Sequence, residues 1–321
     1  MTDSNNYYHG FMSVLQSKTP HKATLVNAIA DLLDIDKDAV YRRLRGEVNF
    51  SFSEIAVIAK NQGISLDKIV GTDIIQSRPA QMTIARLVNP SDSDYELFNN
   101  YIFFFKIIKD EPNTILMEAA NILPHTLYHD YEYLTRYYIF RWNHGSNYFN
   151  VLPYHEISIP ERLRVLQKEN CSYARHIKST VYVLDFHIFQ RLVTDIKYFA
   201  KVRLINENDV SLIKNDLVKF LDSIEYMAIN GKHEETGNEI NLFISDITCD
   251  MNYCCVKSKN IYFTFFRTFI LNATVTFDIE VFNAASSWIL SQQNLSTLIS
   301  VSGDKFRALY FDSQRKIIDT L

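Results

Sequence analysis

Apolar side chains recur at helical spacing along the N-terminal part of the chain. Leu25, Ile29 and Leu33 follow this spacing, which predicts a helix over residues 24–33. A turn at residues 34–35 leads into a second periodic segment over residues 36–45. We therefore expect a helix, a tight turn and another helix in this part of the chain.

Three further segments complete a small helical head. The spacing predicts an opening helix over residues 7–16, a helix that begins at Ser51 and a short fifth helix after it. Ser51 and Glu54 have the spacing of a capping box. Asp36 is expected to cap the helix after the turn through its carboxylate, and Gly46 to end that helix. Helices this short are unstable alone, so we expect them to share one core.

The rest of the chain begins with a turn-rich stretch and then becomes mainly helical. Two clusters of turn residues flank an expected strand over residues 82–88, so we place a linker at residues 76–94. Helical patterns follow at 95–110, 114–122, 126–142, 186–202 and 207–230. The last two are expected to form an αα-hairpin.

Segments rich in β-branched and aromatic residues predict strands in the same region. They lie at 179–184, 240–248, 253–256 and 261–277. The last three are expected to form an antiparallel meander, and helices are expected again at 279–291 and 305–321.

These elements predict two domains of different class. Residues 1–75 form an all-α head, and residues 95–321 form a larger body that carries an antiparallel sheet. Helices and strands are grouped rather than alternating, which favours an α+β, mainly α fold over parallel βαβ units.

Composition and charge narrow the classes of function. The chain of 321 residues is 47% hydrophobic and 22% charged, with only 8 glycines and 7 prolines, as is typical of a globular protein. Its net charge of -4 argues against coating nucleic acid by bulk electrostatics, so any DNA contact must come from a local patch. The polar start lacks a secretory pattern, and Arg267 interrupts the most apolar stretch, so we expect a cytoplasmic protein that does not enter a membrane.

The run Val40-Tyr41-Arg42-Arg43-Leu44-Arg45-Gly46-Glu47 adds a resemblance to a known family. It resembles the Cro/C1-type (XRE-like) helix-turn-helix regulators, in particular the variety at the head of Bacteroides-type regulators. The resemblance implies a five-helix, lambda-repressor-like DNA-binding head joined to an uncharacterised C-terminal domain. Two departures stand out: Asp34 occupies a position where the family often has glycine, and the second core residue is displaced to Leu44.

The resemblance implies that the helix over residues 36–45 enters the major groove of double-stranded DNA. Because Arg matches the two acceptors of guanine, Arg42 is the best candidate for reading a base. Arg43 takes that place if the helix is displaced by one residue. The full set expected to contact DNA is Thr24, Lys37, Tyr41, Arg42, Arg43, Arg45 and Asn49. Alternatively, the cations form a solvated helix face and Tyr41 packs against a neighbouring helix.

Histidines and cysteines in the body offer little chemistry. His125 and His129 share a helix face and could bind a metal, but a third ligand is missing, and we favour hydrogen bonds among tyrosines. The 4 cysteines lack zinc spacing and are expected to be core thiols. No phosphate loop or catalytic motif is recognisable, so we expect neither a cofactor, a metal nor an enzyme.

Arg267 is the candidate for binding an effector. Strand alternation places it on one apolar face with Phe263 and Phe265, where a guanidinium needs an acceptor. An anionic effector is one such acceptor. A bulge that turns Arg267 outward, or a structural partner such as Asp246 or Asp278, is favoured over it.

The sequence therefore predicts a DNA-binding transcriptional regulator whose body senses a signal, dimerises or does both. A homodimer is expected because two heads related by a two-fold axis read two half-sites. Its effector would be an unidentified small molecule or protein. The alternative is an interaction module in which the head binds a protein partner and the body assembles a complex.

Overall fold

The computed structural model describes residues 4–18, 21–62, 64, 66–70, 80–146, 152–259 and 261–321. The chain divides into two compact units, unit 1 over Met1–Pro79 and unit 2 over Ala80–Leu321. The expected linker began at residue 76, and residues 76–79 lie outside the described part. Residues 80–94, also expected in the linker, belong to unit 2 because they include a strand of its sheet.

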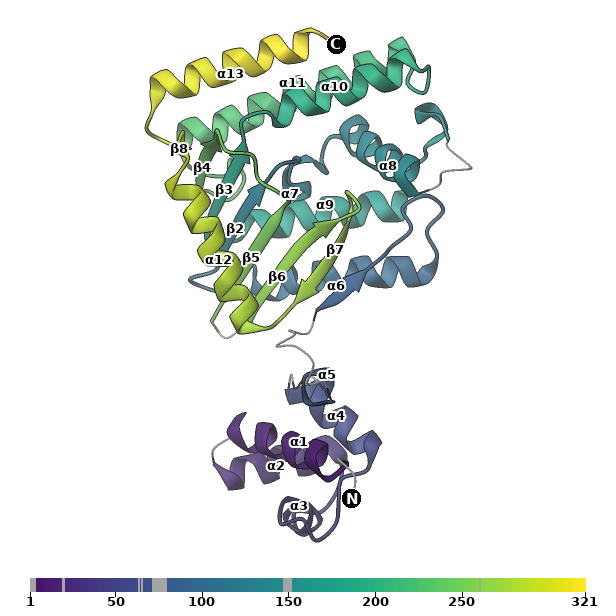
Figure 1. The fold of residues 1–321 in the computed structure, drawn as a ribbon, viewed down its shortest axis with the longest axis vertical. Helices are drawn as coiled ribbons and strands as arrows, with labels where there is room; N and C mark the ends of the chain where they lie inside the picture. The colour runs from purple at the N-terminus through teal and green to yellow at the C-terminus, as the bar shows by residue number, and fades with distance from the viewer. Residues whose placement is uncertain are drawn as a thin grey trace. The chain divides into compact units, whose positions relative to one another are not determined.

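Helices are the only regular secondary structure among the described residues of unit 1 (Figure 1). Its helices are α1 (Ser4–Lys18), α2 (Lys22–Leu33), α3 (Lys37–Leu44), α4 (Phe52–Gln62) and α5 (Leu66–Val70). They share a core to which Leu25, Ile29, Val40 and Ile58 each contribute a fully or almost fully buried side chain. Short amphipathic helices of this kind hold their structure by burying these faces against one another.

The turn between α2 and α3 contains a non-glycine residue in the left-handed region. Asp34 has a φ of 52°, a conformation that glycine adopts most easily and that Asp tolerates better than most other residues. Asp36 was expected to cap α3 with its carboxylate, but its side chain makes no capping hydrogen bond. The capping box of α4 is confirmed: the Glu54 carboxylate accepts from Ser51 N at 2.7 Å, and Glu54 N donates to the Ser51 hydroxyl at 3.3 Å.

The described residues of unit 2 form an eight-stranded mixed sheet in the order β1-β7-β6-β5-β2-β3-β4-β8. The strands are β1 (Gln81–Thr83), β2 (Ile115–Ala120), β3 (Ser179–Asp185), β4 (Glu239–Ser245), β5 (Tyr253–Ser258), β6 (Ile261–Thr268), β7 (Asn272–Thr276) and β8 (Thr297–Leu298). The expected meander is only partly correct. The segment 261–277 is divided into β6 and β7, which form an antiparallel meander with β5, and β1 pairs with β7 at its edge. The segment 240–248 contains β4, which was expected beside β5 but pairs with β3 and β8 instead.

The other half of the sheet corrects two expectations. The segment 114–122 was expected to be helical, but it contains β2, which pairs with β3 on one side and β5 on the other. β2, β3 and β4 run parallel, so the sheet is mixed rather than antiparallel, and helical crossovers connect these strands. The fold of unit 2 is α+β, with parallel and antiparallel pairings in one sheet.

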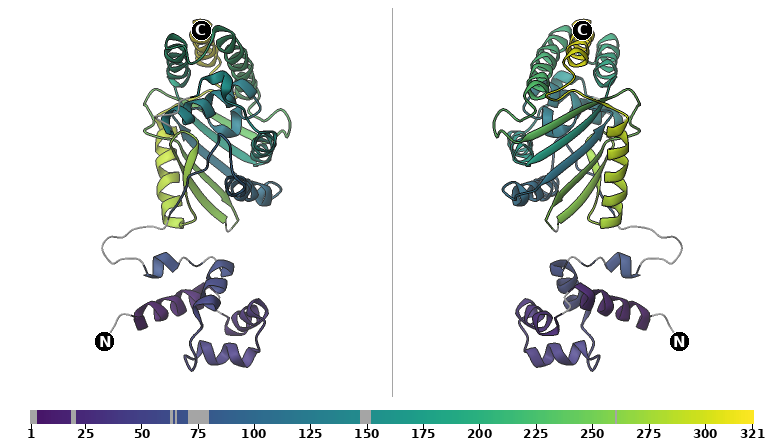
Figure 2. Two further views of the ribbon diagram at one scale, coloured as in Figure 1. Left: turned by 90° about the vertical axis from the view of Figure 1, so that its right-hand side faces the viewer. Right: turned by 90° about the vertical axis from the view of Figure 1, so that its left-hand side faces the viewer.

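Helices cover both faces of this sheet (Figure 2). One face carries α12 (Ile279–Asn294), which packs Phe282 and Ile289 against Ala119 and Val183. The opposite face carries the other helices of unit 2, with α10, α11 and α13 gathered at one end (Figure 1). They are α6 (Asp92–Ile108), α7 (His125–Tyr128), α8 (Glu132–Ser146), η1 (Tyr154–Glu156), α9 (Glu161–Arg175), α10 (Ile188–Lys201), α11 (Glu207–Asn230) and α13 (Asp304–Asp319). The helix expected over residues 126–142 is thus divided into α7 and α8.

Candidate functional site

Helix α3 in unit 1 presents a group of cations to solvent. Val40 and Leu44 are buried in the core of the unit, whereas Lys37, Arg42 and Arg45 are exposed. The Arg42 side chain is 60% exposed and that of Arg43 only 20%. Of the two arginines between which the sequence left a choice, Arg42 is therefore the more accessible to a ligand.

Arg43, also in the set of residues expected to contact DNA, is held by contacts within unit 1. Its guanidinium donates to the Glu54 carboxylate of α4 at 2.9 Å and to the Ala39 carbonyl at 3.3 Å. It also lies 5.8 Å from the ring centroid of Phe50. These contacts join α3 to the capping box of α4.

Glu47 lies among the exposed cations and pairs with two of them. Its carboxylate accepts a 2.6 Å hydrogen bond from Arg45 and lies 3.5 Å from Arg42. The hydrogen bond from Arg45 and the charges of both arginines lower the pKa of Glu47. A phosphate that approached α3 would therefore compete with this carboxylate for the arginines.

The three remaining residues of the predicted set differ in exposure. Thr24 on α2 and Asn49 after α3 are exposed. Tyr41 is half-buried and packs against the core of unit 1, with the Lys22 ammonium 6.0 Å from its ring centroid. Lys22 therefore brings a further cation from α2 beside α3, which the sequence analysis did not identify.

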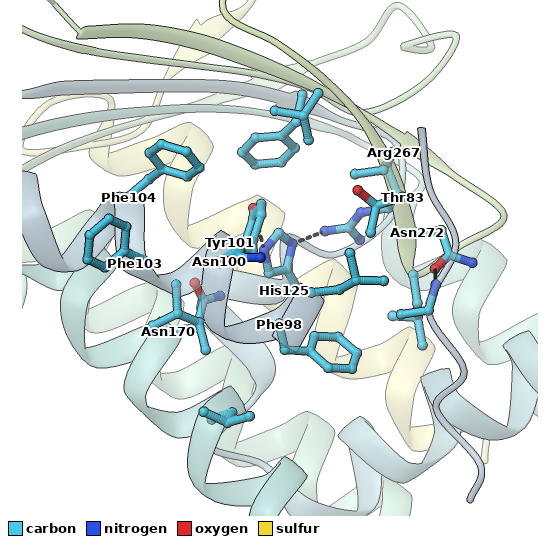
Figure 3. A pocket seen from close by; sticks show the side chains of 18 of the residues that line it. Thr83, Phe98, Asn100, Tyr101, Phe103, Phe104, His125, Asn170, Arg267 and Asn272 are labelled. Atoms are coloured by element: carbon cyan, nitrogen blue, oxygen red, sulfur yellow. Dashed lines mark hydrogen bonds between the residues drawn. The ribbon is translucent and has the colours of Figure 1, made fainter. Parts of the chain in front are cut away.

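Unit 2 contains a mainly apolar cavity of about 490 Å³ (Figure 3). β1, β6 and β7 line it on the sheet side, and α6, α7 and α9 on the helical side. Its apolar walls include Leu97, Phe98, Phe103, Phe104, Phe263, Phe265, Leu271 and Phe277. Its polar residues include Tyr101, His125, His129, Gln167, Asn170 and Arg267. A large apolar cavity with a few convergent polar groups is the usual form of a small-molecule site.

Arg267 on β6 is 8% exposed and lines this cavity, as its place in the strand alternation predicted. The expected bulge is wrong, because Arg267 pairs in regular register with Ala273 of β7. The expected structural partner is present, but it is neither of the two acids named from the sequence. The Arg267 guanidinium donates to the Leu123 carbonyl at 2.9 Å and to Nδ1 of His125 at 2.6 Å.

The arginine determines the proton positions around it. Since a guanidinium only donates, Nδ1 of His125 must accept, and the ring proton lies on Nε2. Burial and then the Arg267 charge hold the pKa of His125 well below its ordinary value, so the ring is neutral. Nε2–H then donates to the Tyr101 hydroxyl at 3.0 Å, which leaves the hydroxyl proton of Tyr101 free for another acceptor (Figure 3).

His129 and Glu118 are two further buried residues whose pKa values the Arg267 charge affects. Burial and the Arg267 charge lower the pKa of His129 to about 3, and its Nδ1 is buried without a hydrogen-bond partner. Glu118 on β2 is fully buried, and burial raises its pKa to about 7 against the opposing effect of Arg267. In the described residues, no three His, Cys, Asp or Glu side chains gather as a metal site would require.

No family model, curated protein or solved structure matches this chain. Among the helices that the structure describes, none has the length and apolar character needed to cross a bilayer.

Sequence reasoning found Arg267 but missed most of the cavity around it. Tyr101 and Asn170 come from α6 and α9, and neither lies in a motif that would single it out. Only Arg267 and the His125/His129 pair carried a signal, namely a cation on an apolar strand face and a helical spacing of four. In the structure, the residues behind these two signals are in direct contact through the hydrogen bond between Arg267 and His125.

Proposed function

We propose that this protein is a sequence-specific DNA-binding transcriptional regulator that acts in the cytoplasm. In this proposal α2 and α3 form a lambda-repressor-like helix-turn-helix, and α3 is the recognition helix. The observation that carries it is the exposed guanidinium of Arg42 on α3, with Lys37, Arg45 and Lys22 as further cations close by in sequence or space.

Roles follow from the exposure of each side chain. Arg42 reads a base, because its forked donors match the two major-groove acceptors of guanine. Lys37, Arg45 and Lys22 contact phosphates, and exposed Thr24 and Asn49 add contacts to the DNA backbone. Because the net charge of the chain is -4, these few cations must supply most of the electrostatic attraction to the DNA phosphates.

We further propose that the protein binds DNA as a homodimer. One recognition helix contacts only a few base pairs, whereas two helices related by a two-fold axis read half-sites about 34 Å apart or a multiple of it. Analytical ultracentrifugation of the full chain with and without its selected duplex measures this state directly. A single chain on a site without two-fold symmetry would contradict the dimer.

The test of DNA binding is selection of duplexes from a random pool by the full chain. We expect an enriched motif, and a loss of about tenfold or more in affinity for it on Arg42→Ala, with weaker discrimination at one base pair. Lys60→Ala on α4 removes an exposed cation from the same unit and serves as the control.

Two outcomes would overturn the proposal: no enrichment at low salt, or an Arg42→Ala variant that binds like the wild type while its circular dichroism is unchanged. A protein partner that co-purifies and is lost on deleting unit 1 would favour the interaction module instead.

A further inference from the structure

The cavity of unit 2 holds a positive charge whose direct hydrogen-bond partners are uncharged. The two hydrogen bonds of the Arg267 guanidinium described above go to a backbone carbonyl and a neutral imidazole, and neither carries a negative charge. A buried guanidinium is costly unless an anion pairs with it. Glu118 compensates this charge only in part, because burial raises the pKa of its carboxyl to about 7.

The donors at this end of the cavity suit a carboxylate. Arg267 has five N–H donors, and the two hydrogen bonds described leave others for a ligand. The Tyr101 hydroxyl accepts from His125, so its own proton can be donated to the same ligand. Burial raises the pKa of Tyr101 well above its ordinary value, which keeps that proton in place. Charge-assisted hydrogen bonds between Arg and a carboxylate are among the strongest in proteins.

The side chains that line the walls of the cavity indicate the chemistry of the remainder of the ligand, beyond its carboxylate. Phe98, Phe103 and Phe104 of α6 line the cavity that Arg267 also lines (Figure 3). Phe263 of β6 belongs to the same lining. Farther along the helical wall, Gln167 and Asn170 are 6% and 3% exposed, and each has a side-chain oxygen without a hydrogen-bond partner. These two acceptors suit a hydroxyl or N–H group on an otherwise apolar body.

We propose that this cavity binds an amphipathic monocarboxylate, with its carboxylate against Arg267 and Tyr101 and its aromatic or aliphatic body among the phenylalanines. The inference concerns unit 2 alone and goes beyond the proposed DNA binding, so either can fail without the other.

Calorimetric titration of the full chain tests it with two ligand series. One runs from phenylacetate to 6-phenylhexanoate and the other from octanoate to dodecanoate. For the best acid of the phenyl series, the alcohol and the amine with the same body are the matched controls. We expect an acid to bind with a Kd below about 1 mM and at least about tenfold more tightly than its alcohol or amine.

Variants locate the binding site. Arg267→Gln is expected to weaken binding of the acid about tenfold or more, and Arg267→Lys to weaken it less. Arg315→Gln, which removes an arginine of α13 outside the cavity, is the control and leaves binding unchanged. If Arg267→Gln fails to fold, Tyr101→Phe removes one donor, and Ala273→Trp fills the cavity from β7 without altering either donor.

Three results would overturn the inference. The first is that no acid of either series binds below about 1 mM. The second is that the alcohol or the amine binds as tightly as the acid. The third is that the acid binds with wild-type affinity to the folded Ala273→Trp variant and also to a folded variant that lacks one donor, either Arg267→Gln or Tyr101→Phe.

Discussion

The guanidinium of Arg267 donates a 2.6 Å hydrogen bond to Nδ1 of His125, so the arginine fixes the tautomer of the histidine. Sequence reasoning treated these residues separately, one as an anion site and the other as half of a metal pair. Their contact makes them part of one hydrogen-bonded group at one end of the cavity.

We predict that His125 in the native protein is neutral and carries its proton on Nε2. Because burial and the Arg267 charge lower its pKa well below 6.5, the ring stays unprotonated as the pH falls through 6.5. Two-dimensional ¹H–¹⁵N spectra that correlate ring nitrogens with ring protons distinguish the tautomers. Exposed His21 provides an internal comparison. A proton on Nδ1, or titration of His125 near 6.5, would contradict the assignment.

Glu118→Gln should change how the stability of unit 2 depends on pH. The carboxyl has a folded pKa of about 7 against an ordinary value of 4.5, so the folded wild type binds more protons between these values. Its stability relative to the Glu118→Gln variant therefore falls as the pH rises from about 4.5 to 7, by on the order of 3 kcal/mol in total. Urea unfolding followed by tryptophan fluorescence reports unit 2, since Trp142 and Trp288 both lie there.

The control for that experiment is the difference between the two proteins at each pH, which cancels the opposite contribution of His125 and His129. Those rings have lowered pKa values, so they destabilise the fold as the pH falls. A difference between the wild type and the Glu118→Gln variant that does not vary with pH would show that the carboxyl titrates near its ordinary value.

Arg43 and Glu54 are predicted to stabilise unit 1 as a pair. Each side chain is 20% exposed, and Arg43 has an additional hydrogen bond to Ala39, so we expect Arg43→Met to cost roughly 1–2 kcal/mol. Hydrogen exchange of α3 amides in the full chain measures this local stability. Combining Arg43→Met with Glu54→Gln should cost less than the sum of the single changes. Strict additivity would mean that the ion pair contributes nothing.

Glu47→Gln is predicted to strengthen DNA binding. It removes the carboxylate that pairs with Arg42 and Arg45, so both guanidinium groups become available to phosphate and base. We expect the affinity for the selected duplex to rise about threefold to tenfold at low salt, with a smaller gain at high salt. Asp31→Asn, which neutralises an exposed acid on α2, is the matched control. Weaker binding by Glu47→Gln would assign Glu47 a direct contact with a base.

The sequence was most informative where structure is local. The helices over residues 24–33 and 36–45 were found because one amphipathic face decides each of them. β2 was mistaken for a helix because Leu116, Met117 and Ala119 favour helices. Pairing with β3 and β5, which are distant in sequence, makes the segment a strand.

The same distinction holds for the two candidate sites. The cations of α3 lie on one short helix, and spacing alone separated exposed Arg42 from buried Val40 and Leu44. The cavity is assembled from segments distant in sequence, as the contact between Tyr101 and His125 illustrates. Alternation predicted that Arg267 faces inward, but no pattern along the chain shows what faces it.

β1 has a practical consequence for dissecting this protein. Gln81 and Thr83 lie in the cavity wall, and Asn272 of β7 accepts a hydrogen bond from Ala85 N at 2.9 Å, which extends that wall beyond the strand. A fragment that began at Tyr95, the boundary indicated by the sequence, would lose this wall and leave β7 as an unpaired edge prone to aggregation. An isolated unit 2 intended for ligand screening must therefore start no later than Ala80.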